Sequence, residues 1–364
     1  VKKIISLMGE NQLLFAWGAN SYCQLGLRSD FSEYLFPQCV ALDNIKSKIT
    51  KITGGGGHSM VLLENGCLYG VGWNSKGQLG LGHFEDVKEL KKIQFPENDR
   101  IIDVSCGWDF TCCLTDIGLV YTFGSNKFGQ LGISIHKLES PKPVCLPLTG
   151  CINVSTGLRH TIAVLSEGTA FAWGDNSKGQ CSEVLMKIID KPTYVSGIDG
   201  IKSAACGQNH SCLLLKSGHL IIFGCNKFGQ LDKSINKKIS PKRHESHIKF
   251  SSICSGWTHI YGIAAEKSVL SWGRNNYAQL GRSSLESFDS VPKPINLSNV
   301  TQVVSGAEHG LALLDSAVFS WGWNEHGNCG HGNTANVTVP TLVPIPGKIK
   351  LIGAGYGTSF AVSS

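Results

Sequence analysis

Histidine recurs along this chain in a pattern that could support metal or catalytic chemistry. The phrase Gly-x-x-His places one histidine at the same point of five repeats, as His58, His160, His210, His259 and His309. Histidine is the commonest metal ligand and general base. A repeat fold, however, spreads one histidine to each unit instead of gathering them. We therefore expect no metal site and no catalytic residue, and we expect each histidine to satisfy buried backbone groups in its own unit.

The cysteines give no metal site either. The chain has 14 of them but no Cys-x-x-Cys pair, and only Cys112 and Cys113 are adjacent. Cys106 and Cys206 stand where other repeats carry small residues, so cysteine serves here as a small hydrophobe. Many unpaired cysteines are typical of a reducing compartment. We expect no cofactor and a cytoplasmic location, with the nucleus as a second location.

A second phrase, Gly-x-Asn-x-x-Gly-Gln-Leu-Gly, occurs seven times at intervals of 49 to 54 residues. Its opening glycines are Gly18, Gly72, Gly124, Gly174, Gly224, Gly273 and Gly322. The glycine–histidine phrase follows each copy of this glycine–asparagine phrase by 32 to 37 residues, although two copies carry Phe110 and Thr358 instead of histidine. Two markers in phase at a fixed long period indicate one supersecondary unit copied along the chain.

The segments between the two phrases predict β-strands. Apolar runs joined by short turns, such as 59–72, 161–174 and 211–224, are typical of hairpins, and no segment shows a sustained helical period. We predict an all-β, seven-bladed β-propeller, because radial repetition protects sheet edges. The final run, 351–362, is expected to pair with 11–18 and close the ring. The alternative is an open solenoid, which would need polar caps.

The same reasoning gives the domain organisation. Residues 11–362 are predicted to form a single propeller, preceded by an N-terminal extension at 1–10.

The glycine–asparagine phrase has a structural explanation. Glycine suits positive φ or close backbone approach, and asparagine hydrogen-bonds its own turn. Its leucine is expected in the core, where Cys181 and Cys329 replace it. Cys23 and Ala278 replace the preceding glycine, which we interpret as a further packing position.

Composition excludes several classes of function. The net charge of +6, from 33 basic and 27 acidic residues, is too small to imply nucleic-acid binding. The segment 232–249 is locally basic, through Lys237, Lys238, Lys242 and Arg243; we interpret it as a solvated loop, with a nuclear-import patch as the alternative. No apolar run is long enough to span a membrane, and the first residues do not resemble a signal peptide. We expect a monomer.

Residues 11–362 resemble the repeats of the regulator of chromosome condensation family. The resemblance rests on both phrases in phase and on the longer stretches 15–21, 52–59, 106–111, 157–160, 255–259 and 320–327. These longer stretches are similar to the branch of secretion-regulating guanine nucleotide exchange factors. The resemblance implies a protein that binds a small Ras-superfamily GTPase and promotes nucleotide release. No covalent catalysis is implied, because such a factor works by differential affinity for two states of its partner.

The resemblance also implies where a partner would bind. Functional side chains of the family fall at the two variable positions of the glycine–histidine phrase. The predicted partner-binding residues are Trp108, Asp109, Arg159, Asn209, Trp257, Glu308 and Tyr356. Trp, Tyr and Arg are enriched at interface hot spots. The alternative is that the tryptophans pack between blades and the charges are merely solvated.

One departure from the family bears on activity. The family's exchange factor for Ran carries a protruding β-wedge inserted in one blade. The stretches between the two phrases are similarly short in all seven repeats here, so we expect no wedge. This favours a second hypothesis from a different class, a non-catalytic scaffold or GTPase effector that binds a protein partner without exchange activity.

Overall fold

The computed structural model describes residues 12–43, 45–96, 99–183, 186–231, 238–244, 248–264, 266–284 and 286–364. The described residues form 28 β-strands and no α-helix, which confirms the predicted all-β class. None of the described residues therefore belongs to a helix that could cross a membrane. The N-terminal extension at 1–10 and half of the basic segment, 232–237 and 245–247, lie outside the described residues. Within that segment Lys238–His244 forms strand β18 instead of the expected loop.

The strands form five four-stranded antiparallel sheets and one eight-stranded sheet. In their spatial order, the four-stranded sheets are β10(Glu139–Cys145)-β9(Val120–Ser125)-β8(Phe110–Thr115)-β7(Ile101–Cys106), then β11(Cys151–Thr156)-β12(His160–Leu165)-β13(Ala170–Asp175)-β14(Ile188–Tyr194), β15(Ile201–Cys206)-β16(His210–Leu215)-β17(Leu220–Cys225)-β18(Lys238–His244), β19(Phe250–Ser255)-β20(His259–Ala264)-β21(Val269–Arg274)-β22(Phe288–Pro294), and β23(Gln302–Ser305)-β24(His309–Leu314)-β25(Ala317–Gly322)-β26(Val337–Leu342).

The eight-stranded sheet joins the two ends of the described chain. Its order is β2(Glu33–Val40)-β1(Leu13–Ala19)-β28(Thr358–Ser363)-β27(Ile349–Ala354)-β3(Ile49–Gly54)-β4(His58–Leu63)-β5(Leu68–Gly72)-β6(Val87–Lys92). Its two halves are connected by one parallel residue pair, Ala354 with Thr53. Strands β1 and β28 pair from Leu13–Ser363 to Gly18–Thr358, which confirms the predicted pairing of the terminal strands.

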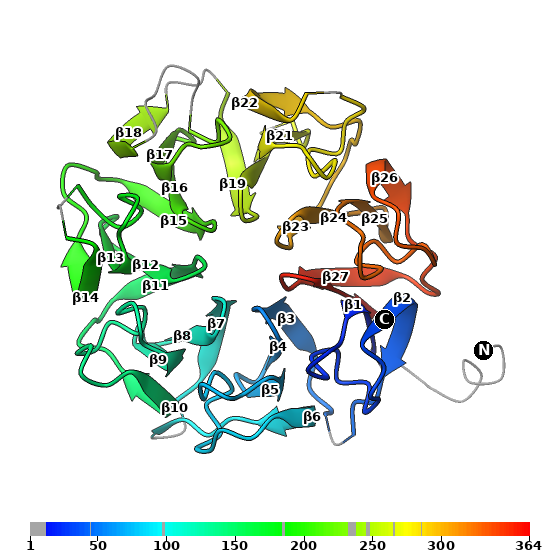
Figure 1. Ribbon diagram of the computed structural model, residues 1–364, viewed down its shortest axis with the longest axis horizontal. Helices are drawn as coiled ribbons and strands as arrows, with labels where there is room; N and C mark the ends of the chain where they lie inside the picture. The colour runs from blue at the N-terminus through cyan, green and yellow to red at the C-terminus, as the bar shows by residue number, and fades with distance from the viewer. Residues whose placement is uncertain are drawn as a thin grey trace.

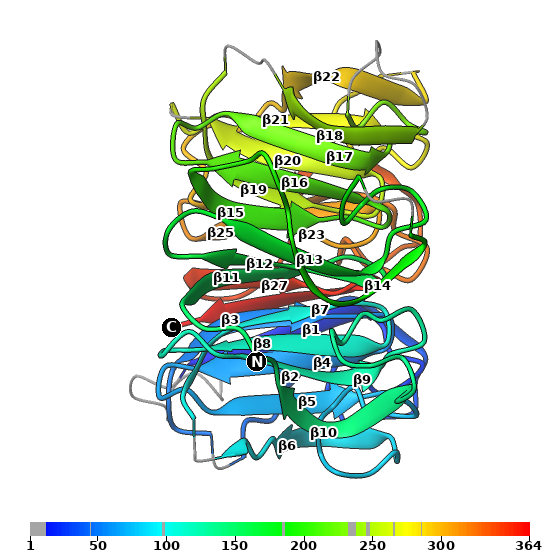
Figure 2. The same cartoon turned by 90° about the vertical axis from the view of Figure 1, so that its left-hand side faces the viewer.

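The sheets stand around a central axis, with strands β3, β7, β11, β15, β19, β23 and β27 nearest to it (Figure 1). Seen from the side, the strands run roughly across the thickness of the ring, between its two ends (Figure 2). Apolar side chains fill the spaces between neighbouring sheets. Trp173, for example, is fully buried and packs in a cluster with Val154 and Leu213. Its indole N–H donates to the carbonyl of Gln130 in the preceding sheet at 2.9 Å.

The opening glycine of each glycine–asparagine phrase is required by its backbone conformation. All seven have φ between 98° and 110°, which disfavours residues with a Cβ. A Cβ on Gly124 would lie 2.6 Å from the carbonyl oxygen of Asp109. That contact belongs to the glycine–histidine loop of the same sheet, so the glycine is what lets the two phrases meet. This explains why they stay in phase along the sequence.

The rest of the phrase builds a turn, as predicted. Asn126 accepts a hydrogen bond from the N–H of Leu131 and donates one to the carbonyl of Lys137. Leu131 is fully buried. The interpretation of Cys23 and Ala278 was incomplete, because both residues adopt positive φ, 59° and 61°. Their position is a left-handed turn as well as a packing position.

The histidines correct part of another expectation. Each ring reaches a hydroxyl group of the next sheet; His160 Nε2 lies 2.9 Å from Ser211 Oγ, and His309 Nε2 lies 3.0 Å from Ser359 Oγ. A hydrogen bond with a backbone group accompanies this contact at His160 and His309. Ser211 in turn donates to the carbonyl of Gln180. Burial lowers the pKa of His58 to about 3 and that of His160 to about 4. His58 and His160, like His210 and His309, whose pKa values burial also lowers, are thus neutral connectors between sheets.

Candidate partner-binding face

Both phrases lie at one end of the ring, which we call the loop face. In each sheet the glycine–histidine loop joins the inner strand to the second strand, and the glycine–asparagine loop follows the third. The two loops are held together by a backbone hydrogen bond. The N–H of Ser125 donates to the carbonyl of Asp109 at 2.9 Å, and Asp175 donates in the same way to Arg159 at 2.8 Å. The predicted residues therefore stand on fixed backbone.

Neighbouring glycine–histidine loops also bind one another around the axis. The N–H of Trp108 donates to the carbonyl of Leu158 at 3.1 Å, and the N–H of Trp257 donates to the carbonyl of Ala307 at 2.8 Å. Tyr356 continues the pattern to Gly55, across the junction between the halves of the eight-stranded sheet. This ring of hydrogen bonds makes the centre of the loop face a rigid platform.

The three predicted aromatic residues meet at the axis. Ring centroids of Trp108 and Trp257 are 6.0 Å apart, those of Trp108 and Tyr356 are 5.9 Å apart, and those of Trp257 and Tyr356 are 5.4 Å apart. Each residue is only partly buried. The three rings therefore pack on one another and, being partly exposed, still offer aromatic surface at the centre of the loop face.

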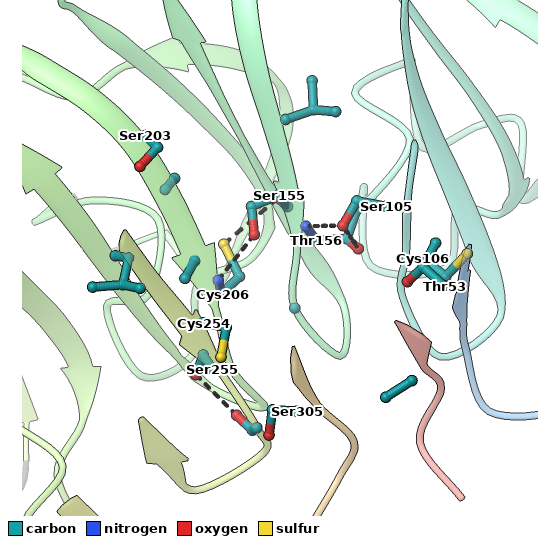
Figure 3. Close-up of a pocket in the computed structure, with 18 of the residues that line it drawn as sticks. Thr53, Ser105, Cys106, Ser155, Thr156, Ser203, Cys206, Cys254, Ser255 and Ser305 are labelled. Carbon is teal, nitrogen blue, oxygen red and sulfur yellow. Dashed lines mark hydrogen bonds between the residues drawn. The ribbon is translucent and has the colours of Figure 1, made fainter. Parts of the chain in front are cut away.

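A channel lies beneath the trio, along the axis of the ring. It has a volume of about 530 Å³ and is lined by the inner strands, with Trp257 and Tyr356 among the lining residues. Hydroxyl and thiol groups point into it (Figure 3). Several are used between strands: Ser105 Oγ lies 2.8 Å from Thr156 Oγ1, and Ser155 Oγ accepts from the N–H of Cys206. Burial raises the pKa of the Cys206 thiol to about 12, so it is no nucleophile.

Asp109 and Arg159 lie on one side of the loop face, around an aromatic side chain. The Arg159 guanidinium stacks 4.2 Å from the ring centroid of Phe128, and Lys127 Nζ lies 5.9 Å from the same ring. Burial raises the pKa of Asp109, while Gln130 donates a 3.4 Å hydrogen bond to its carboxylate. No carboxylate of the described residues forms an ion pair with Arg159 within 4.0 Å.

Lys178 belongs to the glycine–asparagine loop that begins at Asp175, whose backbone N–H donates to the carbonyl of Arg159. We name Lys127, Phe128, Arg159 and Lys178 the free arginine pole.

Glu308 lies elsewhere and is engaged within the protein. The residue is only 5% exposed. It accepts hydrogen bonds from Thr258 Oγ1 at 2.9 Å and from Gln279 Nε2, and it pairs with Arg274 Nη1 at 3.4 Å. Arg274 is stacked 4.8 Å from the ring centroids of both Phe228 and Tyr277.

We name Phe228, Arg274, Tyr277 and Glu308 the locked arginine pole. Glu308 is therefore a structural anion and not a free contact residue. Asn209, the remaining predicted residue, lies partly buried between the two poles along the ring, and its carbonyl accepts from the N–H of Cys225 at 2.8 Å.

The sequence reasoning missed Phe128, Phe228 and Arg274, because it treated the glycine–asparagine loops as purely structural. A signal was present: Asn-Lys-Phe-Gly-Gln-Leu occurs twice, at 126–131 and 226–231, with an exposed lysine and an aromatic residue at positions that the turn itself does not specify. Stacked aromatic rings also occur elsewhere on the loop face, where Tyr22 and Trp73 lie 5.4 Å apart. The described residues contain no group of three His, Cys, Asp or Glu side chains placed to hold a metal ion.

Comparisons with known proteins agree on the family to which the chain belongs. Residues 13–361 match the family model described as RCC1-like domain. The secretion-regulating guanine nucleotide exchange factor of Mus musculus is 38% identical over 96% of this chain and 83% of its own length, and that of Bos taurus is 37% identical over 96% and 82%.

Solved structures agree with the fold. Human WBSCR16 superposes with a TM-score of 0.88 at 22% identity, covering 98% of this chain and 99% of its own. Prp20p of Saccharomyces cerevisiae, whose structure was reported with its binding properties to Gsp1p and histones, superposes at 0.86 with 24% identity, covering 98% and 92%. At these identities the two structures support the fold alone.

Proposed function

Because the chain belongs to the RCC1-like domain family, we propose that it is a guanine nucleotide exchange factor-like propeller that binds a small Ras-superfamily GTPase in the regulation of secretion. The single observation that carries this proposal is 38% identity to a secretion-regulating guanine nucleotide exchange factor over nearly the whole chain. Counting each half of the eight-stranded sheet as one blade gives the proposed seven blades. We further propose residues 11–362 as one domain, acting as a monomer in the cytoplasm and nucleus.

The loop face is the proposed binding surface. Its aromatic trio stands on a hydrogen-bonded platform at the centre, and Arg159 stands beside it with its guanidinium edge unpaired. Aromatic residues and arginine on a rigid, preorganised surface are what protein interfaces use most. Among the described residues of the loop face we identify no nucleophile and no acid–base pair, and the action we propose is a preference for one state of the partner. Such a preference is sufficient for nucleotide exchange.

A second candidate, a scaffold or effector without exchange activity, is favoured by one observation. Glu308, one of the two acidic residues predicted to reach a GTPase, has its carboxylate committed to Thr258, Gln279 and Arg274. Only Asp109 then remains to disturb a magnesium site or engage a lysine of the partner. An effector needs no such group, since it binds the GTPase without opening its nucleotide site.

Fluorescent-GDP release tests both candidates. Small GTPases are loaded with the nucleotide and mixed with micromolar protein, and binding is measured in parallel to the GDP-bound, GTP-bound and nucleotide-free forms. An exchange factor accelerates release from one GTPase and binds its nucleotide-free form best. Binding to the GTP form without acceleration would establish the effector instead. Failure to bind any GTPase would refute both.

Matched double variants locate the surface. Asp109→Asn with Arg159→Gln changes the loop face, while Asp116→Asn with Lys216→Gln changes exposed turns at the opposite end of the ring. We expect the first pair to weaken GTPase binding by about tenfold, because an interfacial arginine and its neighbour are lost. The second pair should leave binding unchanged. Equal effects of the two pairs would place the GTPase away from the loop face.

A further inference from the structure

The free arginine pole has unsatisfied cations on one side of the loop face. Lys127 and Lys178 are exposed, and no ion pair within 4.0 Å involves either lysine or Arg159 among the described residues. The nearby carboxylates are already engaged. Asp109 accepts from Gln130, and Asp175 accepts from the N–H of Ser177 at 2.9 Å. Asp109 is close enough to interact electrostatically with Arg159 but forms no ion pair with it within 4.0 Å, so the guanidinium has no carboxylate partner in direct contact among the described residues.

Stacking leaves Arg159 ready to bind. Phe128 covers one face of the guanidinium at 4.2 Å, which fixes its plane. The N–H donors lie in that plane and point outward from its edge, so stacking does not consume them. A planar fork held in place binds a carboxylate through two parallel hydrogen bonds, with less side-chain entropy to lose than a free arginine. Lys127, above the same ring, adds a second charge near the first.

From this arrangement we propose that the free arginine pole binds an acidic segment of the partner protein, with a carboxylate on Arg159 and a neighbouring carboxylate on Lys127. The inference deepens the proposed function and rests on its premise that the loop face binds a protein. Charge complementarity identifies the occupant: the surface is cationic and fixed, so the partner must present Asp or Glu side chains.

A protein fits the pole better than a nucleic acid. Nucleic-acid surfaces neutralise many phosphates with a continuous basic stripe. Here Asp109 and Asp175 interrupt the cations, and the net charge of the whole chain is only +6. The neighbouring surface is the aromatic trio, a composition typical of protein interfaces. Two or three carboxylates of one acidic segment would satisfy the pole.

The locked arginine pole provides a matched control within the same molecule. Lys227 stands over Phe228 at 5.1 Å, in the same Asn-Lys-Phe-Gly sequence as Lys127 over Phe128. Its neighbouring arginine, Arg274, already holds Glu308 at 3.4 Å and donates to Asn276 Oδ1 at 2.9 Å. Lys227 thus reproduces the lysine and the ring without an available arginine.

The experiment measures binding of a fluorescein-labelled deca-glutamate peptide by fluorescence anisotropy at low salt, using the full chain. We expect Arg159→Gln to weaken binding about tenfold and Lys127→Gln about threefold, since a charge-assisted fork is stronger than an exposed ammonium pair. Lys227→Gln should change binding less than about twofold, because a lone exposed ammonium contributes little. Thermal unfolding verifies that each variant is folded; Lys127→Gln, at an exposed side chain, keeps the test decisive if Arg159→Gln is unstable.

Three outcomes would overturn the proposal. Wild-type binding by Lys127→Gln and Arg159→Gln would show that the pole is not the site. Equal weakening by Lys227→Gln would show only general attraction to positive charge. Tighter binding of a labelled deca-deoxythymidine, weakened by the same variants, would make the pole a nucleic-acid site. Failure of the peptide test while GDP release proceeds would mean that the GTPase docks elsewhere, so the two proposals fail separately.

Discussion

The two arginine poles share one sequence motif but differ in whether the arginine is paired with a carboxylate. Asn-Lys-Phe-Gly-Gln-Leu places Phe128 and Phe228 at equivalent points of two loops, and each ring carries an arginine from the next sheet. Arg159 comes from a glycine–histidine loop, whereas Arg274 follows the opening glycine of a glycine–asparagine phrase. Arg274 can therefore pair with the buried carboxylate of Glu308, whereas Arg159 forms no ion pair within 4.0 Å among the described residues.

This difference separates stability from recognition. At the locked pole the carboxylate is buried, and its hydrogen bonds come from Thr258, Gln279 and Arg274, so the charges serve the junction between two sheets. At the free pole Asp109 has a pKa raised by burial, and Arg159, which is partly buried, forms no ion pair within 4.0 Å among the described residues. Two sites with the same sequence motif thus differ in whether the arginine is paired with a carboxylate of the protein. We expect the first to control folding and the second to control binding.

Removing the carboxylate at each pole should give the largest difference in stability between them. Glu308→Ala leaves Arg274 and Gln279 without their buried acceptor, and we expect a loss of about 3 kcal/mol in the free energy of unfolding. Asp109→Ala removes a carboxylate that burial already disfavours, so the loss should stay below about 1 kcal/mol. Urea unfolding measures both. Equal losses would mean that the poles do not differ in the way proposed.

The pH dependence of stability tests the role of His160, the buried residue next to Arg159 of the free pole. His160 follows Arg159 in the chain, and burial lowers its pKa to about 4. The unfolded chain, with an ordinary histidine pKa near 6.5, binds the proton more readily in the window between these values. Stability is therefore full above pH 6.5 and declines as the pH falls toward 4. Between pH 8 and pH 5 this histidine should account for a loss of about 2 kcal/mol.

His160→Gln isolates that contribution. The amide can still reach Ser211 but does not titrate, so the variant should lose about 2 kcal/mol less than the parent protein between pH 8 and pH 5. His58, His210 and His309 remain, each with a pKa lowered by burial to about 3, and they provide the common background in both proteins. An unchanged pH dependence in the variant would show that His160 is not neutral in the folded state.

Much of this architecture followed from sequence because its causes are local. Positive φ at the opening glycines and turn hydrogen bonds at residues such as Asn126 act within one repeat, so the phrases reveal them directly. The pairing of β1 with β28 also followed, since repeats copied in phase leave one place for the terminal strands.

The poles did not follow from sequence, because they depend on contacts between sheets. The sequence around Glu308 does not indicate that Arg274, 34 residues earlier, would bind its carboxylate. The variable positions of the glycine–asparagine loops looked like solvated turn residues, and only their neighbours make Phe128 and Phe228 platforms. Likewise, the sequence placed Trp108, Trp257 and Tyr356 on one face but could not show that they pack on one another at the axis.

The smallest expected effect tests whether the platforms themselves are equivalent. The left-handed position after the aromatic residue is Gly129 at the free pole, with φ of 75°. At the locked pole it is Gly229 after Phe228, with φ of 70°, and Ala278 after Tyr277, with φ of 61°. A Cβ on Gly129 would also lie 2.9 Å from Asp190 Cα. We expect Gly129→Ala to cost about 1.5 kcal/mol, since it combines left-handed strain with a close contact.

The reverse change at the locked pole should have the opposite sign. Ala278→Gly relieves the strain of a left-handed residue but adds conformational entropy to the unfolded chain, and the net gain should be about 0.5 kcal/mol. Urea unfolding of both variants provides the measurement, and peptide binding provides the control, because neither change touches the guanidinium of Arg159. Destabilisation by Ala278→Gly would mean that the alanine methyl group makes packing contacts worth more than the strain. The two loops would then differ in their packing as well as in the arginine they hold.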